Sequence, residues 1–384
     1  MSALIPILLL KNLFSTGQYR YAIHGPKSKR TDNLGKSKLN ETNNKAIRIG
    51  VIGAGAFASR RHLPSLVESS DAEIVALCRR NQEMLVKMAD HFNVERTFTD
   101  YCAMLDNVEM DGVLVASPHA LHYEHAKTAL ERNLHVLIEK PMTVRSDEAR
   151  DLIVLAEAKK RVLLIALNPP YWAHGLFLQK AIQDGEIGEI EAININWVGD
   201  VREVYGKIPF PANLPGVVPP TTFRADPKMA GGGHLLDGGS HLVCEILWAT
   251  KLRPIAVSAV MDDADTDLRC AVNLRLENGA FCTISLVGDS EVRRRFHSTY
   301  FGSKGTLIVD GIPFKVTMQK PDGELLVHEE DQMETPQQPV DNFIDAILGR
   351  AQPLSTGDDG LRVVEVIEAA YQSSRTGKII SLSL

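Results

Sequence analysis

A β-branched run that leads directly into a glycine turn is the feature that most constrains how this chain can fold. Residues 47–52 read as a strand buried on both faces, and Gly53-x-Gly55-x-x-Ala58 follows at once. Apolar positions at helical spacing continue to about residue 67. In this order of strand, turn and helix, a GxGxxA motif indicates dinucleotide binding, whereas alone it is a weak signal that often reflects packing only.

The residue types in the turn suit the phosphates of a dinucleotide. Gly53 permits the tight turn, Gly55 lets the backbone approach a pyrophosphate, and Ala58 is small enough for close packing of helix on strand. The N–H groups at the helix start, at Ala56 and Phe57, carry partial positive charge that favours phosphate oxygens. We therefore expect this turn to hold a dinucleotide.

Strands and helices alternate from residue 47 to about 167. After the first strand, the pattern predicts further strands at 73–78, 96–98, 112–116, 135–138 and 162–167. Helices are predicted between them at 82–92, 101–105, 123–133 and 143–160. Such alternation with apolar strands predicts a doubly wound parallel sheet of the Rossmann type, with ligands at the carboxyl ends of its strands.

The pattern changes beyond Asn168. Strand-like runs dominate, at 190–198, 254–261, 268–276, 281–287, 297–301, 306–309 and 315–318, and turns such as Glu277-Asn278-Gly279 separate several of them. Helices are predicted at 176–184, from about 234, and at 340–348 and 360–375. We therefore predict a tail at 1–46, a Rossmann domain at 47–167, and an α+β domain at 168–384 with a large, mostly antiparallel, open sheet.

Charge and composition limit the partners of this chain. The net charge of −6 combines +6 on residues 1–46 with −12 on the remainder, and so acidic a body argues against nucleic acid as a partner. No apolar run reaches the ~18 residues needed to cross a bilayer. Five scattered cysteines without a CxxC pair indicate reduced thiols and a cytoplasmic location. The tail reads as disorder or an unprocessed leader; an organellar transit peptide remains an alternative, and secretion fits less well.

Two arginines stand where the ribose of the cofactor is usually recognised. The end of the second strand normally carries an acidic residue that binds the 2′-hydroxyl of NAD, but here it holds Cys78-Arg79-Arg80. Guanidinium groups suit a 2′-phosphate, which favours NADP, with NAD possible. A solvated basic turn is the alternative.

Two further segments carry groups that suit proton transfer. Lys140 follows a strand in Glu139-Lys140-Pro141 and can orient a hydroxyl or move a proton, although an exposed loop lysine would look the same. In the segment 231–241, Asp237 and His241 lie four residues apart on a predicted helix, where the carboxylate can orient the ring. A helix cap with an unrelated histidine is the alternative.

His119, His122 and His125 do not form a credible metal site. Their spacing of three spreads them around a straight helix, and no carboxylate or cysteine completes a ligand set. The polar ends of the strands instead predict contacts to the cofactor. The predicted cofactor-binding residues are Gly53, Gly55, Ala56, Phe57, Arg79, Arg80, Ser117, His119, His122, Glu139 and Lys140.

A set of motifs resembles the Gfo/Idh/MocA oxidoreductases, the family of glucose–fructose oxidoreductase and inositol dehydrogenase. The resemblance covers nearly everything from Ile47 onward: GAGAFA at 53–58, SPHALH at 117–122, EKP at 139–141, GEIGEI at 185–190, FRADPKMAGGGHLLDGGSH at 223–241, FGSKGTL at 301–307 and the closing DGLRVVEVIEAAYQSSRTGK. Two positions depart from the family pattern, since His119 stands where Asn is common and Cys244 replaces a frequent aspartate.

The resemblance implies hydride transfer between a nicotinamide and a hydroxyl-bearing carbon, usually of a sugar or polyol. It implies that Lys140, Asp237 and His241 are the catalytic residues, with the histidine as general acid/base and the other two positioning the hydroxyl. It also implies a homodimer or homotetramer formed through the open sheet.

Two other functional classes remain open on the same fold. A non-catalytic NADP-sensing regulator would keep the glycines without needing Lys140 or His241. A redox-neutral enzyme would use a bound nicotinamide to oxidise and re-reduce a sugar during hydrolysis or epimerisation. The segment 200–222, long and rich in proline, is expected near the substrate mouth or in a subunit contact.

Overall fold

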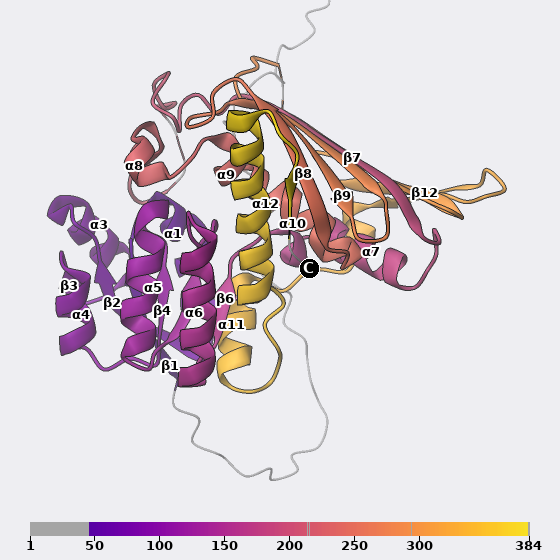
Figure 1. The fold of residues 1–384 in the computed structure, drawn as a ribbon. Helices are drawn as coiled ribbons and strands as arrows, with labels where there is room; N and C mark the ends of the chain where they lie inside the picture. Colours follow the sequence, from indigo (N-terminus) through magenta and orange to yellow (C-terminus); the bar gives the residue numbers. More distant parts are fainter. Residues whose placement is uncertain (1–45, 213, 215, 293, 383–384) are drawn as a thin grey trace, which may run out of the picture.

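The computed structural model describes residues 46–212, 214, 216–292 and 294–382. Except for Ala46, the predicted tail lies outside the described residues. The rest forms two domains, each built around one sheet (Figure 1).

The first sheet confirms the predicted Rossmann architecture. Its six strands are all parallel and follow the order β3-β2-β1-β4-β5-β6, which is that of dinucleotide-binding folds. The strands are β1 Ile47–Ile52, β2 Ala72–Cys78, β3 Thr97–Phe98, β4 Gly112–Val115, β5 His135–Ile138 and β6 Leu163–Ile165. All four residues of β4 are buried, as expected for a strand covered by helices on both faces.

Helices flank this sheet where the periodicity predicted them. They are α1 Ala56–Arg61, α2 Leu63–Glu68, α3 Gln82–Phe92, α4 Tyr101–Asn107, α5 His122–Glu131 and α6 Ser146–Lys159. Local sequence explains their starts, because the side chains of Asn81 and Asp100 accept hydrogen bonds from the first backbone N–H groups of α3 and α4.

The second sheet has nine strands in the order β14-β13-β12-β11-β7-β10-β9-β8-β15. Its strand pairs are antiparallel except for β7 with β10, which confirms the mostly antiparallel prediction. The strands are β7 Ile190–Val198, β8 Pro254–Met261, β9 Arg269–Leu276, β10 Phe281–Val287, β11 Arg295–Gly302, β12 Gly305–Gly311, β13 Lys315–Gln319, β14 Leu325–Glu329 and β15 Ile380–Ser381. Strands β14 and β15 were not predicted: β15 has two residues, and no residue of β14 is fully buried.

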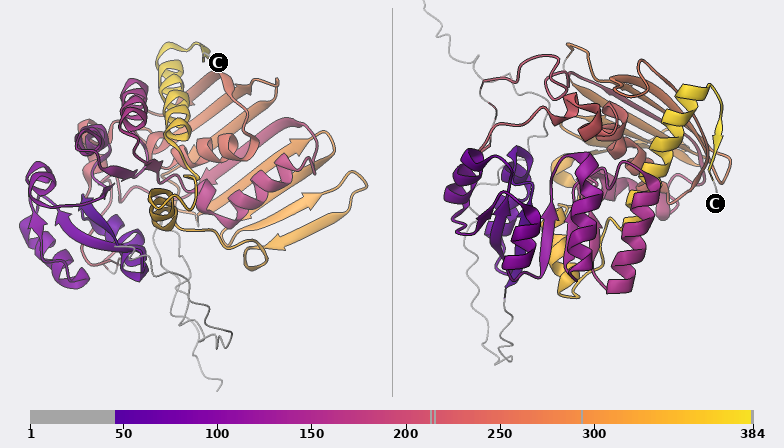
Figure 2. Two further views of the ribbon diagram at one scale, coloured as in Figure 1. Left: turned by 90° about the horizontal axis from the view of Figure 1, so that it is seen from below. Right: turned by 60° about the vertical axis from the view of Figure 1, so that its left-hand side comes forward.

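Among the described residues, helices cover one face of the second sheet and leave the other open (Figure 2). Burial alternates strictly along β9, as expected when one face packs and the other is solvated. The helices that follow β6 along the chain are α7 Ala173–Gln183, α8 Pro227–Ala230, α9 His234–Asp237, α10 Gly239–Thr250, α11 Pro339–Ile347 and α12 Gly357–Thr376. The described residues also form 3₁₀ turns, η1 His119–Leu121 in the first domain and η2 Pro169–Tyr171, η3 Phe223–Ala225 and η4 Glu330–Gln332 after β6.

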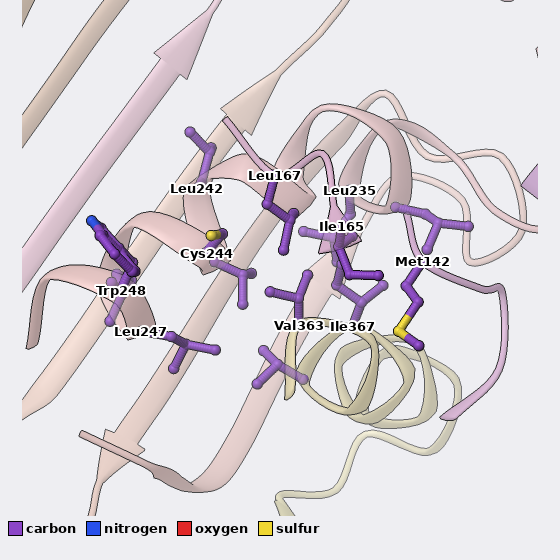
Figure 3. Close-up of a cluster of buried hydrophobic side chains, with 14 of the residues drawn as sticks. Met142, Ile165, Leu167, Leu235, Leu242, Cys244, Leu247, Trp248, Val363 and Ile367 are labelled. Carbon is purple, nitrogen blue, oxygen red and sulfur yellow. The ribbon is translucent and has the colours of Figure 1, made fainter. Parts of the chain in front are cut away.

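Helix α12 joins the two domains. It packs against α6 of the Rossmann domain and against β8 and α10 of the second domain (Figure 1). Buried side chains from both domains meet there, including Met142 and Ile165 from the first and Leu242 and Leu247 from the second (Figure 3). The core is therefore continuous across the junction, which fixes the position of one sheet relative to the other.

Helix α11 belongs by packing to the Rossmann domain, although the sequence analysis placed it in the second. Its residues Val340, Phe343 and Ile344 lie in the same buried cluster as Ile49 and Leu114. Phe343 is 1% exposed, and its ring approaches the backbone of Gly112 so closely that a Cβ there would lie 3.3 Å from Cζ. The chain thus returns to the first domain before α12.

We expect Phe343→Ala to lower the free energy of unfolding by about 3–5 kcal/mol, because it leaves a cavity under the Rossmann sheet. Urea unfolding monitored by far-UV circular dichroism measures this change. Val154→Ala is the control, since Val154 is 64% exposed and its truncation should cost less than about 0.5 kcal/mol. Equal effects of the two substitutions would contradict the assignment of α11 to the first core.

Candidate active site

One cavity of about 1860 Å³ runs between the Rossmann domain and the second sheet. The glycine turn and Arg79 line one end of it. Lys140, Asp237 and His241 line another part, together with Trp197 from β7. The cavity therefore brings together the predicted cofactor-binding turn and the three predicted catalytic residues.

The turn after β1 requires its glycines. Gly53 has a φ of +88°, and a Cβ there would lie 2.5 Å from the backbone nitrogen of Ser117. The N–H groups of Gly53 and Ala54 both donate to the carbonyl of Cys78 at 3.0 Å, so β2 fixes the turn. Gly55, Ala56 and Phe57 line the cavity at the start of α1, where backbone N–H groups could hold a phosphate.

Arg79 and Arg80 both line the cavity beside this turn. The Nη1 group of Arg79 donates to the carbonyl of Ala54 at 3.0 Å, and its half-buried position lowers the pKa of its guanidinium. Its Nε is buried without a hydrogen-bond partner among the described residues, whereas Arg80 is exposed. Arg60 and Arg61 line the same region and were not predicted; their position directly after the glycine motif is the signal that could have identified them.

Glu139 is held by a histidine that the sequence analysis did not select. His62 Nε2 lies 2.6 Å from Glu139 Oε1, and both side chains are buried. Burial alone would raise the pKa of Glu139, but the hydrogen bond and charge of His62 outweigh it and lower that pKa. The other carboxylate oxygen accepts the backbone N–H of Lys140 at 3.2 Å, so His62 and Glu139 together fix the start of the segment that carries Lys140.

Asp237 lies between two cations. Lys140 Nζ donates to its Oδ1 at 2.7 Å and to its backbone carbonyl at 2.9 Å. Arg224 of η3 donates through Nε to Oδ2 at 2.7 Å and through Nη2 to Oδ1 at 2.9 Å. Burial would raise the pKa of Asp237, but the charges of Arg224 and Lys140 hold it well below its usual range. Arg224, within the FRADPK motif, is therefore a site residue that the sequence analysis missed.

The predicted pairing of Asp237 with His241 is wrong. Asn168 contacts His241 instead: its backbone N–H donates to Nδ1 at 3.4 Å, and its side-chain amide lies 3.2 Å from Nε2. In a regular helix the carbonyl of Asp237 would accept the backbone N–H of His241, but here it accepts Lys140 Nζ and the Ser240 hydroxyl. The backbone N–H of His241 donates to the carbonyl of Gly238 instead. The prediction assumed one continuous helix, whereas α9 ends at Asp237.

Burial, reinforced by the charge of Lys140, lowers the pKa of His241 well below its usual range. The ring is therefore neutral at pH 7. A neutral imidazole at the cavity wall can accept a proton, which an imidazolium cannot.

His119 and His122 are buried and are not among the described residues that line the cavity, so their contact with the cofactor stays a prediction. Both ring nitrogens of the fully buried His122 are used, at 2.7 Å from the Pro141 carbonyl and 2.8 Å from the Ser117 carbonyl. His119, 3% exposed, places Nε2 3.5 Å from Asp237 Oδ1 and Nδ1 3.0 Å from the Ala230 carbonyl. They therefore hold the loops that carry the site. Ser117 does line the cavity, as predicted.

The loop predicted near the substrate mouth lines the cavity. Its lining residues include Val201, Glu203 and Phe210, together with Thr222 just before η3. Across the described part of the chain, no three His, Cys, Asp or Glu side chains are grouped so that they could hold a metal ion. None of the described helices is both long and apolar enough to cross a membrane.

The buried pair of His62 and Glu139 provides a stability test. His62→Phe should lower the free energy of unfolding by about 3–5 kcal/mol, because it leaves the Glu139 carboxylate buried without its partner. Adding Glu139→Gln to that variant should recover part of the loss, and a double-mutant cycle by urea unfolding gives the coupling. Lys87→Ala, which breaks an exposed pair with Glu83, is the control and should cost less than about 0.5 kcal/mol. A coupling near zero would show that the pair does not stabilise the fold.

Comparisons with known proteins agree with this architecture. Residues 47–167 match the model of an oxidoreductase family with an NAD-binding Rossmann fold, and residues 176–308 match the GFO/IDH/MocA C-terminal domain. The chain is 29% identical over 353 residues to dTDP-3,4-didehydro-2,6-dideoxy-alpha-D-glucose 3-reductase of Saccharopolyspora spinosa, covering 87% of this chain and 99% of the relative. It is 24% identical to D-xylose 1-dehydrogenase (NADP(+)) 2 of Haloferax volcanii, with coverage of 87% and 99%.

The fold is also that of solved structures. The crystal structure of aldose-aldose oxidoreductase from Caulobacter crescentus, complexed with glycerol, superimposes with a TM-score of 0.75 at 23% identity, covering 88% of this chain and 100% of that one. The Rossmann domain and the second domain thus match, in this order along the chain, the two domain models of one family. The chain belongs to the Gfo/Idh/MocA family and is an NAD(P)-dependent oxidoreductase that acts on CH–OH groups.

Proposed function

We propose that this protein transfers hydride between NADP and a hydroxyl-bearing carbon of a sugar or polyol, with Lys140, Asp237 and His241 as its catalytic residues. The observation that carries the proposal is that these three side chains line the same cavity as the glycine turn. The relatives named above are reductases and dehydrogenases of sugars, which supports a carbohydrate as the substrate.

The lysine is arranged to bind the reacting hydroxyl. An ammonium group has three N–H donors, and Lys140 uses two of them on the carbonyl and carboxylate of Asp237. The third is left for an oxygen of the substrate. Asp237 keeps the lysine in place, and its two carboxylate oxygens already accept hydrogen bonds from Lys140 and Arg224.

His241 is the proposed general acid/base. Its neutral ring can take the hydroxyl proton when the substrate is oxidised and return it when the carbonyl is reduced. The backbone N–H of Asn168 lies 3.4 Å from Nδ1 and its side-chain amide 3.2 Å from Nε2, which orients the ring. The ring nitrogen that takes the proton exchanges its contact with Asn168 for one with the substrate hydroxyl. The nicotinamide, when bound, supplies or accepts the hydride.

The preference for NADP over NAD rests on the arginines beside the glycine turn. Arg79 and Arg80 replace the acidic residue that usually binds the ribose hydroxyls of NAD, and Arg60 lines the same end of the cavity. Guanidinium groups recognise phosphate by charge-assisted, bidentate hydrogen bonds. A 2′-phosphate fits this chemistry better than a free hydroxyl does.

We also propose a homodimer or homotetramer formed through the open face of the second sheet. Val260 and Phe281 are 75% and 64% exposed, which is unusual for large apolar side chains in strands. The compartment remains a prediction, and the five free thiols favour the cytoplasm.

Lys140→Met should lower turnover at least about 100-fold and leave the affinity for NADP unchanged, because it removes the ammonium group that binds the hydroxyl and pairs with Asp237. Cofactor binding is measured by fluorescence titration, and turnover by absorbance with a panel of aldoses, methyl glycosides and polyols. Lys87→Met, on the exposed face of α3, is the control. Unchanged turnover would remove Lys140 from the mechanism, and no turnover of any sugar by the wild type would overturn the proposed function. A bound cofactor that never exchanges would instead favour redox-neutral chemistry.

Arg79→Asp should weaken NADP binding about 10–100-fold and shift the preference toward NAD, since a carboxylate repels the 2′-phosphate and accepts the ribose hydroxyl. Calorimetric titration with both cofactors gives the ratio of dissociation constants. Arg96→Asp, at an exposed arginine before β3, controls for the change of net charge. An unaltered NADP/NAD ratio would contradict the role given to Arg79.

A further inference from the structure

His234 is a buried histidine at the cavity that the proposed mechanism does not use. Its side chain lines the cavity, and the residue is 3% exposed. Neither ring nitrogen has a hydrogen-bond partner among the described residues. Buried polar atoms in native proteins are nearly always paired, so an unpaired imidazole at a cavity wall indicates a missing ligand.

The position of the ring is built into the surrounding backbone. Two glycines make room for it: a Cβ at Gly238 would lie 2.4 Å from His234 Cε1, and a Cβ at Gly288 would lie 2.7 Å from Cδ2. The ring also meets Trp197 edge-on, with centroids 4.8 Å apart and an interplanar angle of 67°. Trp197 lines the cavity as well. The ring thus occupies a fitted slot at the end of β7 and β10.

The backbone at His234 is anchored without any help from its ring. The His234 N–H donates to the carbonyl of Asp267 at 2.7 Å, and the Leu235 N–H donates to its carboxylate at 2.8 Å. The Tyr371 hydroxyl donates to the other oxygen of that carboxylate at 2.7 Å. Because these bonds fix the segment, the ring nitrogens have no structural task of their own.

We propose that His234 is a specificity-determining residue that hydrogen-bonds a hydroxyl of the substrate remote from the carbon that reacts. The proposal rests on the proposed function, since it takes the substrate to be a sugar or polyol. A neutral imidazole has one donor and one acceptor nitrogen, and a hydroxyl group can both donate and accept, so it can bond to either nitrogen. Trp197 beside it offers the apolar surface that the C–H groups of a sugar ring require.

Burial lowers the pKa of His234 to about 4, so its ring is neutral throughout the physiological range. A neutral ring does not attract a carboxylate or phosphate through charge. It therefore selects an uncharged hydroxyl at this position.

His234→Phe tests the proposal, because it keeps a ring of similar shape and removes both nitrogens. The wild type and the variant are compared with NADP at saturation. The substrate is the sugar or polyol that the wild type turns over fastest in the panel above, together with each of its monodeoxy derivatives. Tyr205→Phe is the matched control. Its hydroxyl is also buried and has no hydrogen-bond partner among the described residues, Tyr205 is not among the residues that line the cavity, and its ring meets that of His234 edge-on with centroids 6.3 Å apart.

The wild type should prefer the parent sugar over one monodeoxy derivative by about ten-fold or more in kcat/KM, and His234→Phe should lose that preference for this derivative alone. The dissociation constant of NADP should stay unchanged. The melting temperature should not fall, because removing buried unpaired polar atoms does not weaken the fold. Tyr205→Phe should change none of the sugar preferences.

An unchanged monodeoxy profile in His234→Phe would overturn the inference while the proposed function stands. The same loss in Tyr205→Phe would overturn it too, since the effect would then come from packing. If the wild type turns over no sugar or polyol, the proposed function fails and this inference fails with it.

Discussion

The ion pair between Lys140 and Asp237 is the interaction on which the site depends, because it joins the two domains at the cavity. Lys140 follows β5 of the Rossmann sheet, and Asp237 ends α9, 97 positions later. Their side chains are only 11% and 13% exposed, and buried charges are stable only when they are paired. The continuous core around α12 holds the two domains at the distance that this pair requires.

The protonation states of the neighbouring groups follow from this pair. Asp237 is ionised between Lys140 and Arg224, and burial, reinforced by the positive charge of Lys140, lowers the pKa of His241. The histidine therefore stays neutral and is oriented by the amide of Asn168. One arrangement of charges thus yields a fixed ammonium that donates and a neutral ring that accepts, as hydride transfer from an alcohol requires.

Much of the fold could be predicted from the sequence because its signals are local. The glycine turn, the apolar strands and the alternation in the first half lie within short windows, and they led to a six-stranded parallel sheet. The pairing within the site could not be predicted this way. Glu139 meets His62 across 77 positions and Asn168 meets His241 across 73, and no periodicity encodes such contacts. The prediction that Asp237 pairs with His241 came from their four-residue spacing. It failed because Lys140, from the other domain, bonds to the backbone carbonyl of Asp237 that would have continued the helix.

The histidines show how the same residue type divides between scaffold and site. His122 uses both ring nitrogens on backbone carbonyls, and His119 bonds a carbonyl while facing Asp237. Their rings replace hydrogen bonds that the irregular backbone at the strand ends cannot make for itself. His234 differs because its backbone is already anchored by Asp267, so its ring is not needed for the fold. Where the scaffold is complete without a buried polar group, the reason for that group has to be sought in the ligand.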